Sequence, residues 1–228
     1  MKRLLPALII LLLLISCGNN TSEDNNYITT SDNIKLAYTY QEGTNQKAVL
    51  LLHMLGKDKS DYDTLFKYLN DYGYTVLAID FRGHGESELD YNDFTDEDWQ
   101  KLVLDAEAGI NYLEEQGYEQ IAVVGASIGA NAALIEAADD ERVDTLILLS
   151  AGEDYHGLIT LESAKLYNKP VIFFASYEDK DAAVAATKLF NAVDTEYKDI
   201  KLLNKGHGTE ILSELVGQDI VNWLENYY

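Results

Sequence analysis

Short apolar runs alternate with amphipathic helical patterns along most of this chain, and this alternation restricts the folds that it can adopt. From residue 48 onward, strands are predicted at residues 48–53, 75–80, 121–125, 143–149, 170–175 and 200–203. Each run is short and apolar enough to be buried on both faces, as in a parallel sheet covered by helices. Residues 34–40 alternate like a half-buried strand and are predicted to pair with 27–30. The pattern predicts an α/β fold with a mainly parallel central sheet of about eight strands.

Helices are predicted in the intervals between these strands. They cover residues 61–71, 127–138, 181–191 and 210–227, and a further helix carries apolar residues from Trp99 to Leu113 at helical spacing. Thr95 and Asp98 form a capping box in front of that helix. About 20 residues separate the strand ending at Leu149 from the next strand. This length allows a loop and one short helix, but no lid domain.

The first residues have the layout of an export signal. Two basic residues precede an apolar run over residues 4–15, which is too short to cross a bilayer as a helix because a spanning helix needs about 20 residues. Residues 14–17, Leu-Ile-Ser-Cys, resemble the bacterial lipobox, in which the cysteine is lipidated and becomes the new N-terminus. An ordinary signal peptide with an incidental cysteine is the alternative. We therefore expect an exported lipoprotein anchored at the cell-envelope membrane, with a signal at 1–16, a lipidated Cys17, a polar tether at 17–26 and a folded domain at 27–228.

Cysteine content and charge exclude several classes of function. Cys17 is the only cysteine in the chain, so no intrachain disulfide, cysteine nucleophile or cysteine-based zinc site is expected. The formal net charge is −22, from 17 basic and 39 acidic residues. Such a surface repels phosphate backbones and anionic lipid headgroups. We therefore expect no nucleic-acid partner and membrane attachment through the lipid anchor only. The sequence carries no signal for a particular oligomeric state.

A serine motif lies where a predicted strand meets a predicted helix. Gly125-Ala126-Ser127-Ile128-Gly129 has the pattern of a nucleophile elbow, in which a sharp turn exposes the serine hydroxyl and the glycines let strand and helix approach closely. The alternative is a glycine-rich turn whose serine caps the helix. A serine hydroxyl needs a base to remove its proton and a third group to orient that base. A histidine and an acid are therefore expected in the remaining sequence.

His207 is the best placed of the four histidines to act as that base. It lies between the last predicted strand and the last predicted helix, which places it at the same edge of the sheet as Ser127. His53 is expected to brace a turn, and His84 to pack in a glycine-rich loop beside the site. His156 is either a contact for substrate or an exposed loop residue.

The acid is expected between the serine and the histidine in chain order. Residues 176–181, Ser-Tyr-Glu-Asp-Lys-Asp, follow a predicted strand and carry three carboxylates. Asp179 is the predicted acid, and Glu178 and Asp181 are the alternatives. Asp181 is expected to cap the helix that follows.

These motifs together resemble the α/β-hydrolase superfamily over residues 34–228. The matching segments are LLHMLG, AIDFRGHGES, GASIG, SYED and GHG, in this order. The resemblance implies the α/β-hydrolase fold without a lid, and an oxyanion hole formed by the backbone N–H groups of Ile128 and Leu55. Met54, the alternative to Leu55, stands where many members have glycine. It is also a candidate for contact with substrate.

The resemblance implies a serine esterase with no metal or organic cofactor. Ser127 would attack the carbonyl of a small or medium acyl ester, and the oxyanion hole would hold the tetrahedral charge. His207 would pass the proton to the leaving group, and water would release the acyl-enzyme. The same triad could cleave an amide or a thioester, because fold and triad do not fix the bond. A surface binding protein that has lost activity is the alternative from another class.

Overall fold

The computed structural model describes residues 26–228. The predicted signal, the lipidation site Cys17 and the tether up to residue 25 lie outside the described residues and stay predictions. Within residues 26–228, no helix is both long and apolar enough to span a bilayer.

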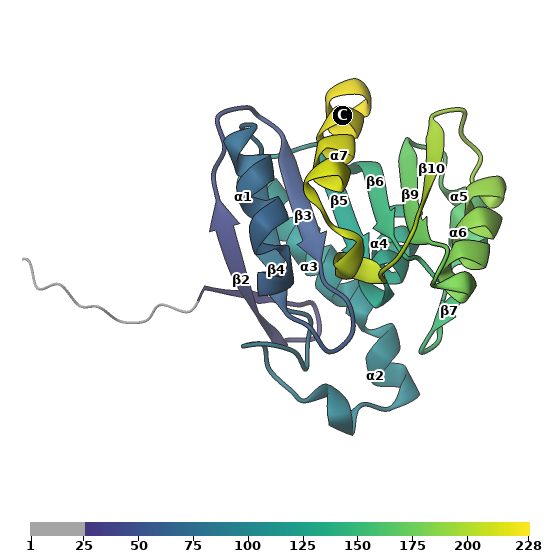
Figure 1. Cartoon of the computed structure of the whole chain (residues 1–228). Coiled ribbons are helices and arrows are strands. Elements are labelled where there is room, and N and C mark those ends of the chain that lie inside the picture. Colours follow the sequence, from purple (N-terminus) through teal and green to yellow (C-terminus); the bar gives the residue numbers. More distant parts are fainter. Residues whose placement is uncertain (1–25) are drawn as a thin grey trace, which may run out of the picture.

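An eight-stranded sheet with helices on both faces forms the centre of the molecule (Figure 1). Its order is β1-β2-β4-β3-β5-β6-β9-β10. The hairpin pair β1–β2 and the pair β2–β4 are antiparallel, and the other pairs are parallel. The α/β-hydrolase fold predicted from the sequence is confirmed. The strands are β1 (Tyr27–Thr29), β2 (Lys35–Gln41), β3 (Ala48–Leu52), β4 (Thr75–Ile79), β5 (Ile121–Ala126), β6 (Val143–Leu149), β9 (Val171–Ser176) and β10 (Lys198–Leu203).

Side chains of the buried strands alternate between two apolar cores, one on each face of the sheet. Along β3, Val49 and Leu51 belong to one core, and Leu50 and Leu52 belong to the other. This alternation follows from the two-residue period of a strand, and it explains why these strands read as continuous apolar runs. The first core is covered by α1 (Asp63–Asp71) and α7 (Glu214–Tyr227), and the second by α3 (Leu102–Glu115), α4 (Ile128–Ala137), α5 (Leu161–Leu166) and α6 (Lys180–Ala192).

Two predicted helices, 127–138 and 181–191, differ from the structure by one residue at each end, and three others differ more. A 3₁₀ turn, η1 (Lys59–Tyr62), precedes α1, and the helix expected around Trp99 is divided into α2 (Asp96–Gln100) and α3. The capping box of Thr95 and Asp98 is confirmed. The last helix was expected from residue 210, but α7 begins at Glu214 because the Ser213 hydroxyl accepts from the Val216 N–H.

Further short elements lie in the connections. The segment after β6 contains a two-stranded hairpin, β7 (Asp154–Tyr155) and β8 (Leu158–Ile159), in addition to the expected short helix. The remaining 3₁₀ turns are η2 (Tyr91–Asp93), which precedes α2, and η3 (Gly208–Ile211), which precedes α7. The loops after β3, β4, β5, β6, β9 and β10 all leave the sheet at the carboxyl ends of parallel strands, which is the lower edge in Figure 1.

His53 joins the loops that follow β3 and β4. Its Nδ1–H donates to the Met54 carbonyl at 2.8 Å, and its Nε2 accepts from the Phe81 N–H at 2.9 Å. The ring is fully buried, and burial lowers the pKa of His53 from 6.5 to about 4. The predicted bracing role is confirmed, since a neutral ring satisfies both loops. His84 is also buried and stacks on Tyr91 with 4.5 Å between ring centroids.

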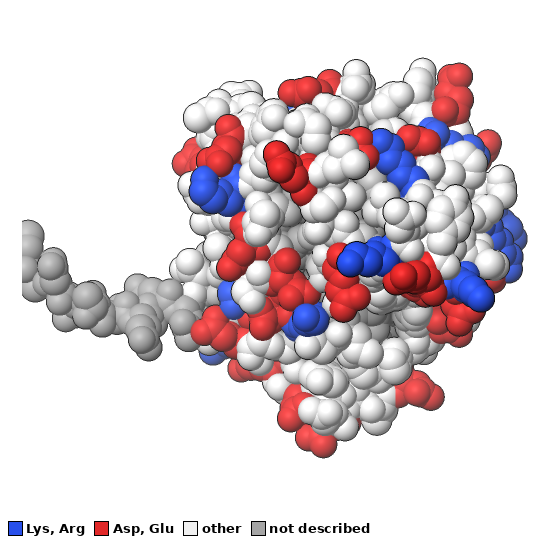
Figure 2. All heavy atoms as spheres, in the orientation of Figure 1, with Lys and Arg blue, Asp and Glu red and all other residues white. Residues whose placement is uncertain are grey.

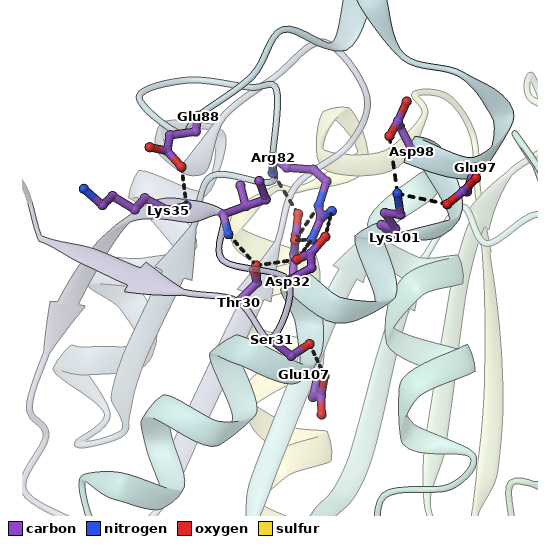
Figure 3. A network of polar contacts seen from close by, with 12 residues as sticks. Thr30, Ser31, Asp32, Lys35, Arg82, Glu88, Glu97, Asp98, Lys101 and Glu107 are labelled. Carbon is purple, nitrogen blue, oxygen red and sulfur yellow. Dashed lines mark hydrogen bonds and ion pairs between the residues drawn. The ribbon is translucent and has the colours of Figure 1, made fainter.

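The buried Arg82 forms an ionic network with two carboxylates, the buried Asp105 and the exposed Asp32 (Figure 3). Its Nε donates to Asp105 of α3 at 2.8 Å, and its two terminal nitrogens donate to Asp32, in the turn between β1 and β2, at 2.8 and 2.9 Å. Burial raises the pKa of Asp105 to about 6 although Arg82 opposes the rise. The hydrogen bonds from Arg82 lower the pKa of Asp32 to about 2. The network ties the opening hairpin to the loop after β4.

Replacement of Arg82 by methionine should destabilise the fold strongly. The Arg82→Met variant leaves the Asp105 carboxylate buried without its partner, which costs about 3–5 kcal/mol in the free energy of unfolding. Urea unfolding measures this loss. The control is Lys67→Met, because Lys67 and Asp71 form a surface pair with side chains 77% and 61% exposed. It should cost less than about 1 kcal/mol. Equal losses in the two variants would contradict the assignment.

The buried His53 should make stability depend on pH. Its folded pKa of about 4 lies below the ordinary value of 6.5, so the unfolded chain binds the proton first. The ring's contribution is complete above pH 6.5 and is lost as the pH falls toward 4. The slope is at most about 1.4 kcal/mol per pH unit. His53→Asn keeps a donor near Nδ1 but cannot titrate, so its free energy of unfolding should fall less steeply over this range.

The exposed His156 provides the control for this comparison, through the variant His156→Asn. Its unfolding free energy, measured by urea titration at several pH values, should follow the wild-type slope. The same slope for His53→Asn and wild type would show that His53 is not the group responsible.

Candidate active site

Ser127 lies on a sharp turn between β5 and α4. Its φ of +52° and ψ of −116° place it outside the conformations that non-glycine residues usually adopt. The Ser127 N–H donates to the Leu149 carbonyl of β6 at 2.8 Å, and the residue is 7% exposed. This is the geometry expected of a nucleophile elbow, in which the turn carries the hydroxyl beyond the end of the strand.

The two glycines of the serine motif lie where backbones come into contact. A Cβ at Gly125 would lie 2.4 Å from the Gly129 carbonyl oxygen, and a Cβ at Gly129 would lie 2.4 Å from the Leu52 carbonyl oxygen. Either contact would force the backbone to shift. The close packing of α4 on β5 and β3 therefore requires glycine at both positions.

The structure brings His207 and Asp179 together with Ser127. The Ser127 Oγ lies 2.7 Å from the His207 Nε2. On the other side of the ring, Nδ1 donates to the Asp179 Oδ2. With the proton on Nδ1, Nε2 is free to accept the serine proton. The side chains of His207 and Asp179 are 37% and 23% exposed, so the ring is open to solvent on one side.

The three carboxylates after β9 have different environments. Asp179 contacts His207 through Oδ2, and its Oδ1 accepts from the Ala182 N–H at 3.3 Å. Asp179 is therefore the N-cap of α6, and the prediction that Asp181 caps this helix was wrong. The helix begins one residue earlier than expected, which moves Asp181 into its first turn. Glu178 and Asp181 are both exposed, and neither bonds to His207 in the described part of the chain.

The N–H groups predicted to form the oxyanion hole are unpaired. Within residues 26–228, neither the Leu55 N–H nor the Ile128 N–H donates a hydrogen bond to a protein atom. Ile128 is the first residue of α4, where the N–H groups have no partner inside the helix and the helix dipole favours negative charge. Free donors of this kind can hold a developing oxyanion. Their role stays a prediction.

The two candidates for substrate contact lie in different surroundings. Met54 is 7% exposed and packs against residues 204–208, the loop that carries His207 and is called the histidine loop below, since a Cβ added at Gly208 would lie 2.5 Å from the Met54 sulfur. His156 is exposed and stacks on Trp99, with 4.3 Å between ring centroids and 25° between planes. Contact of either residue with substrate stays a prediction.

Tyr155 is a site residue that the sequence analysis missed. Its hydroxyl donates to the Ser150 carbonyl at 3.3 Å, and its ring lies edge-on to His207 with 6.3 Å between centroids. Burial raises the pKa of Tyr155 to about 12, so the hydroxyl stays a proton donor. The sequence signal for this hairpin is the pair His156-Gly157. These two residues, with φ values of +52° and +84°, form the two-residue turn between β7 and β8.

The charged and metal-ligating side chains that the structure describes form no second candidate centre. Among residues 26–228, no group of three or more His, Cys, Asp or Glu side chains is arranged to hold a metal ion. Figure 2 shows acidic side chains spread over the face that carries α1 and α7, with basic side chains in a few isolated groups. The hydrogen-bonded Ser127, His207 and Asp179 are the candidate active site in the described part of the chain.

Known proteins resemble this chain in sequence and in fold. A carboxylesterase of Bacillus subtilis is 41% identical over 92 residues, which are 40% of this chain and 35% of that protein. The human serine hydrolase BPHL is 33% identical over 108 residues, 47% of this chain and 36% of that protein. The chain thus matches little more than a third of the length of either relative.

The structural comparison covers more of the molecule. An esterase of Pyrococcus furiosus superposes with a TM-score of 0.78 at 20% identity, over 89% of this chain and 91% of the other, which shows the same fold. The model of the family described as serine aminopeptidase, S33, matches residues 43–169, more than half of the chain. The chain therefore belongs to this family, within the α/β-hydrolase superfamily.

Proposed function

We propose that this protein is a serine hydrolase that cleaves carboxylic esters of small or medium acyl groups through an acyl-enzyme on Ser127. The observation that carries the proposal is the pair of hydrogen bonds that link Ser127 to His207 and His207 to Asp179. The similarity to a carboxylesterase over 92 residues supports an ester as the bond cleaved.

The proposed reaction begins with attack of the Ser127 Oγ on the ester carbonyl carbon, while the His207 Nε2 takes the serine proton. Negative charge develops on the carbonyl oxygen, and the N–H groups of Leu55 and Ile128 would stabilise it. The doubly protonated His207, stabilised by Asp179, then gives its proton to the departing alcohol. His207 then takes a proton from a water molecule, which attacks the acyl-enzyme. The carboxylic acid product leaves and Ser127 regains its proton.

The openness of the site supports small or medium acyl groups. The segment between β6 and β9 folds into the β7–β8 hairpin and α5, and α5 packs beside α4 and α6. It therefore contributes to the body of the fold and leaves no separate lid to enclose a long acyl chain.

Amide hydrolysis is the second candidate function. The observation that favours it is the description of the matching family, which names a serine aminopeptidase. The same three residues would serve, because His207 can protonate a leaving amine as well as a leaving alcohol. Turnover of p-nitrophenyl acetate and butyrate, compared with that of aminoacyl p-nitroanilides, decides between the two bonds.

Ser127 should be the residue that a fluorophosphonate probe labels, because only an activated hydroxyl attacks such a reagent at a useful rate. Labelling and ester turnover should both vanish in Ser127→Ala. Ser213→Ala is the matched control, since Ser213 is exposed and caps α7. Folded wild-type protein that neither reacts with the probe nor turns over ester or amide would favour the binding-protein alternative.

Asp179→Asn should fold and yet lose activity. Asparagine is as good an N-cap as aspartate, so α6 keeps its start. The amide holds the His207 ring in the wrong tautomer, which lowers kcat by about 10³ to 10⁴. Glu178→Gln and Asp181→Asn should each cost about tenfold or less. If ester turnover stays near wild type in Asp179→Asn and collapses in one of the other variants, Asp179 is not the acid.

A further inference from the structure

Two buried serines contact the residues on either side of His207. The Ser176 Oγ donates to the Gly206 carbonyl at 2.7 Å, and the Gly208 N–H donates to the Ser150 Oγ at 2.9 Å. Both serines are fully buried. Ser150 follows β6 and Ser176 ends β9, which are neighbours in the sheet. The histidine loop is therefore fastened to two adjacent strands, one bond before and one bond after His207.

The loop itself has a backbone with much freedom. Gly206 and Gly208 have φ values of +97° and +55°, in the region that favours glycine. Glycine has the largest conformational freedom of the backbone of any residue. The local hydrogen bonds of the His207 backbone run to Glu210, which is exposed. Bonds to buried partners are needed to fix such a loop, and the two serines supply them.

Ser176 also contacts the segment that carries the acid. Its Oγ accepts from the Asp179 N–H at 3.2 Å while it donates to Gly206. One hydroxyl thus fixes the distance between the backbone that carries Asp179 and the loop that carries His207. A change at Ser176 would disturb both partners of the His207–Asp179 hydrogen bond.

Ser150 adopts a strained conformation. Its φ is +55°, where glycine would be the unstrained choice. The difference between serine and glycine at this position is the side chain, whose Oγ contacts the histidine loop. The Ser150 carbonyl also accepts a hydrogen bond from the Tyr155 hydroxyl. The strain therefore coincides with a side-chain contact that glycine could not make.

We propose that Ser150 and Ser176 are positioning residues that hold His207 within hydrogen-bonding distance of Ser127. The proposal rests on the function proposed for Ser127 and His207. A displacement of a catalytic group by about 1 Å can cost about 10²-fold in rate. The two hydroxyls thus act on turnover through His207, without touching the substrate.

Three variants test the proposal by steady-state kinetics. Ser176→Ala, Ser150→Ala and Ser150→Gly should each lower kcat about 10- to 100-fold and change KM by about twofold or less. Ser150→Ala keeps the strain and Ser150→Gly relieves it, so similar losses in both assign the effect to the hydroxyl. Wild-type kcat in folded Ser176→Ala and Ser150→Gly overturns the proposal.

A double-mutant cycle separates positioning from simple stabilisation. In the His207→Ala background, removing the Ser176 hydroxyl should leave the residual turnover unchanged, because the residue it positions is gone. A further drop in that background, equal to the drop in wild type, overturns the proposal. The matched control is Thr145→Val, which removes a buried hydroxyl bonded to Trp223 and Pro170. It should lower stability and leave kcat per folded molecule unchanged.

Amide hydrogen exchange gives a measurement that does not depend on catalysis. The Gly208 N–H should exchange faster in Ser150→Gly than in wild type, because its acceptor is missing. If wild type has neither turnover nor probe labelling but this faster exchange is found, the proposed function fails and the anchoring of the loop stands. Unchanged Gly208 exchange, whatever the turnover, overturns the role of Ser150.

Discussion

The hydrogen bond between the Ser127 Oγ and the His207 Nε2 joins residues that lie 80 positions apart in the chain. The distance between these two atoms depends on the register of the parallel strands. Ala126 at the end of β5 pairs with Leu149 of β6, and Ser176 at the end of β9 pairs with Leu203 of β10. Because these strands end at one edge, the loops that follow them start within reach of one another. A shift of one residue in any pair would separate His207 from Ser127.

Polar contacts continue the order of the sheet into those loops. Arg82 and His53 use their nitrogens to tie separate segments together, and both are buried. Ser150 and Ser176 do the same for the histidine loop. The free energy of unfolding falls when such a buried polar group loses its hydrogen-bond partner. A buried polar contact has a fixed distance and direction, which an apolar contact lacks, so such contacts can place loop atoms at the precision that catalysis requires.

The sequence predicted the parts of the site that depend on local pattern. Ser127 and His207 lie between glycines at strand–helix boundaries, and the boundaries follow from buried runs that an apolar sheet requires. Tyr155 was missed because β7 and β8 have two residues each, too few to show a period. Ser150 and Ser176 were missed because their partners, Gly208 and Gly206, come from a loop far along the chain. Contacts between segments so far apart in the chain produce no local pattern of residue spacing.

The position of Asp179 shows how one residue of register decides a role. Its two carboxylate oxygens have separate partners, the Ala182 N–H through Oδ1 and the His207 ring through Oδ2. The cap fixes the side-chain rotamer, so the orientation of the carboxylate toward His207 is set by the start of α6. A helix beginning at Asp181 would have left Asp179 in the loop without this restraint. The Asp179 carboxylate is therefore oriented by the start of α6, while the Ser176 hydroxyl holds the Asp179 backbone through its N–H.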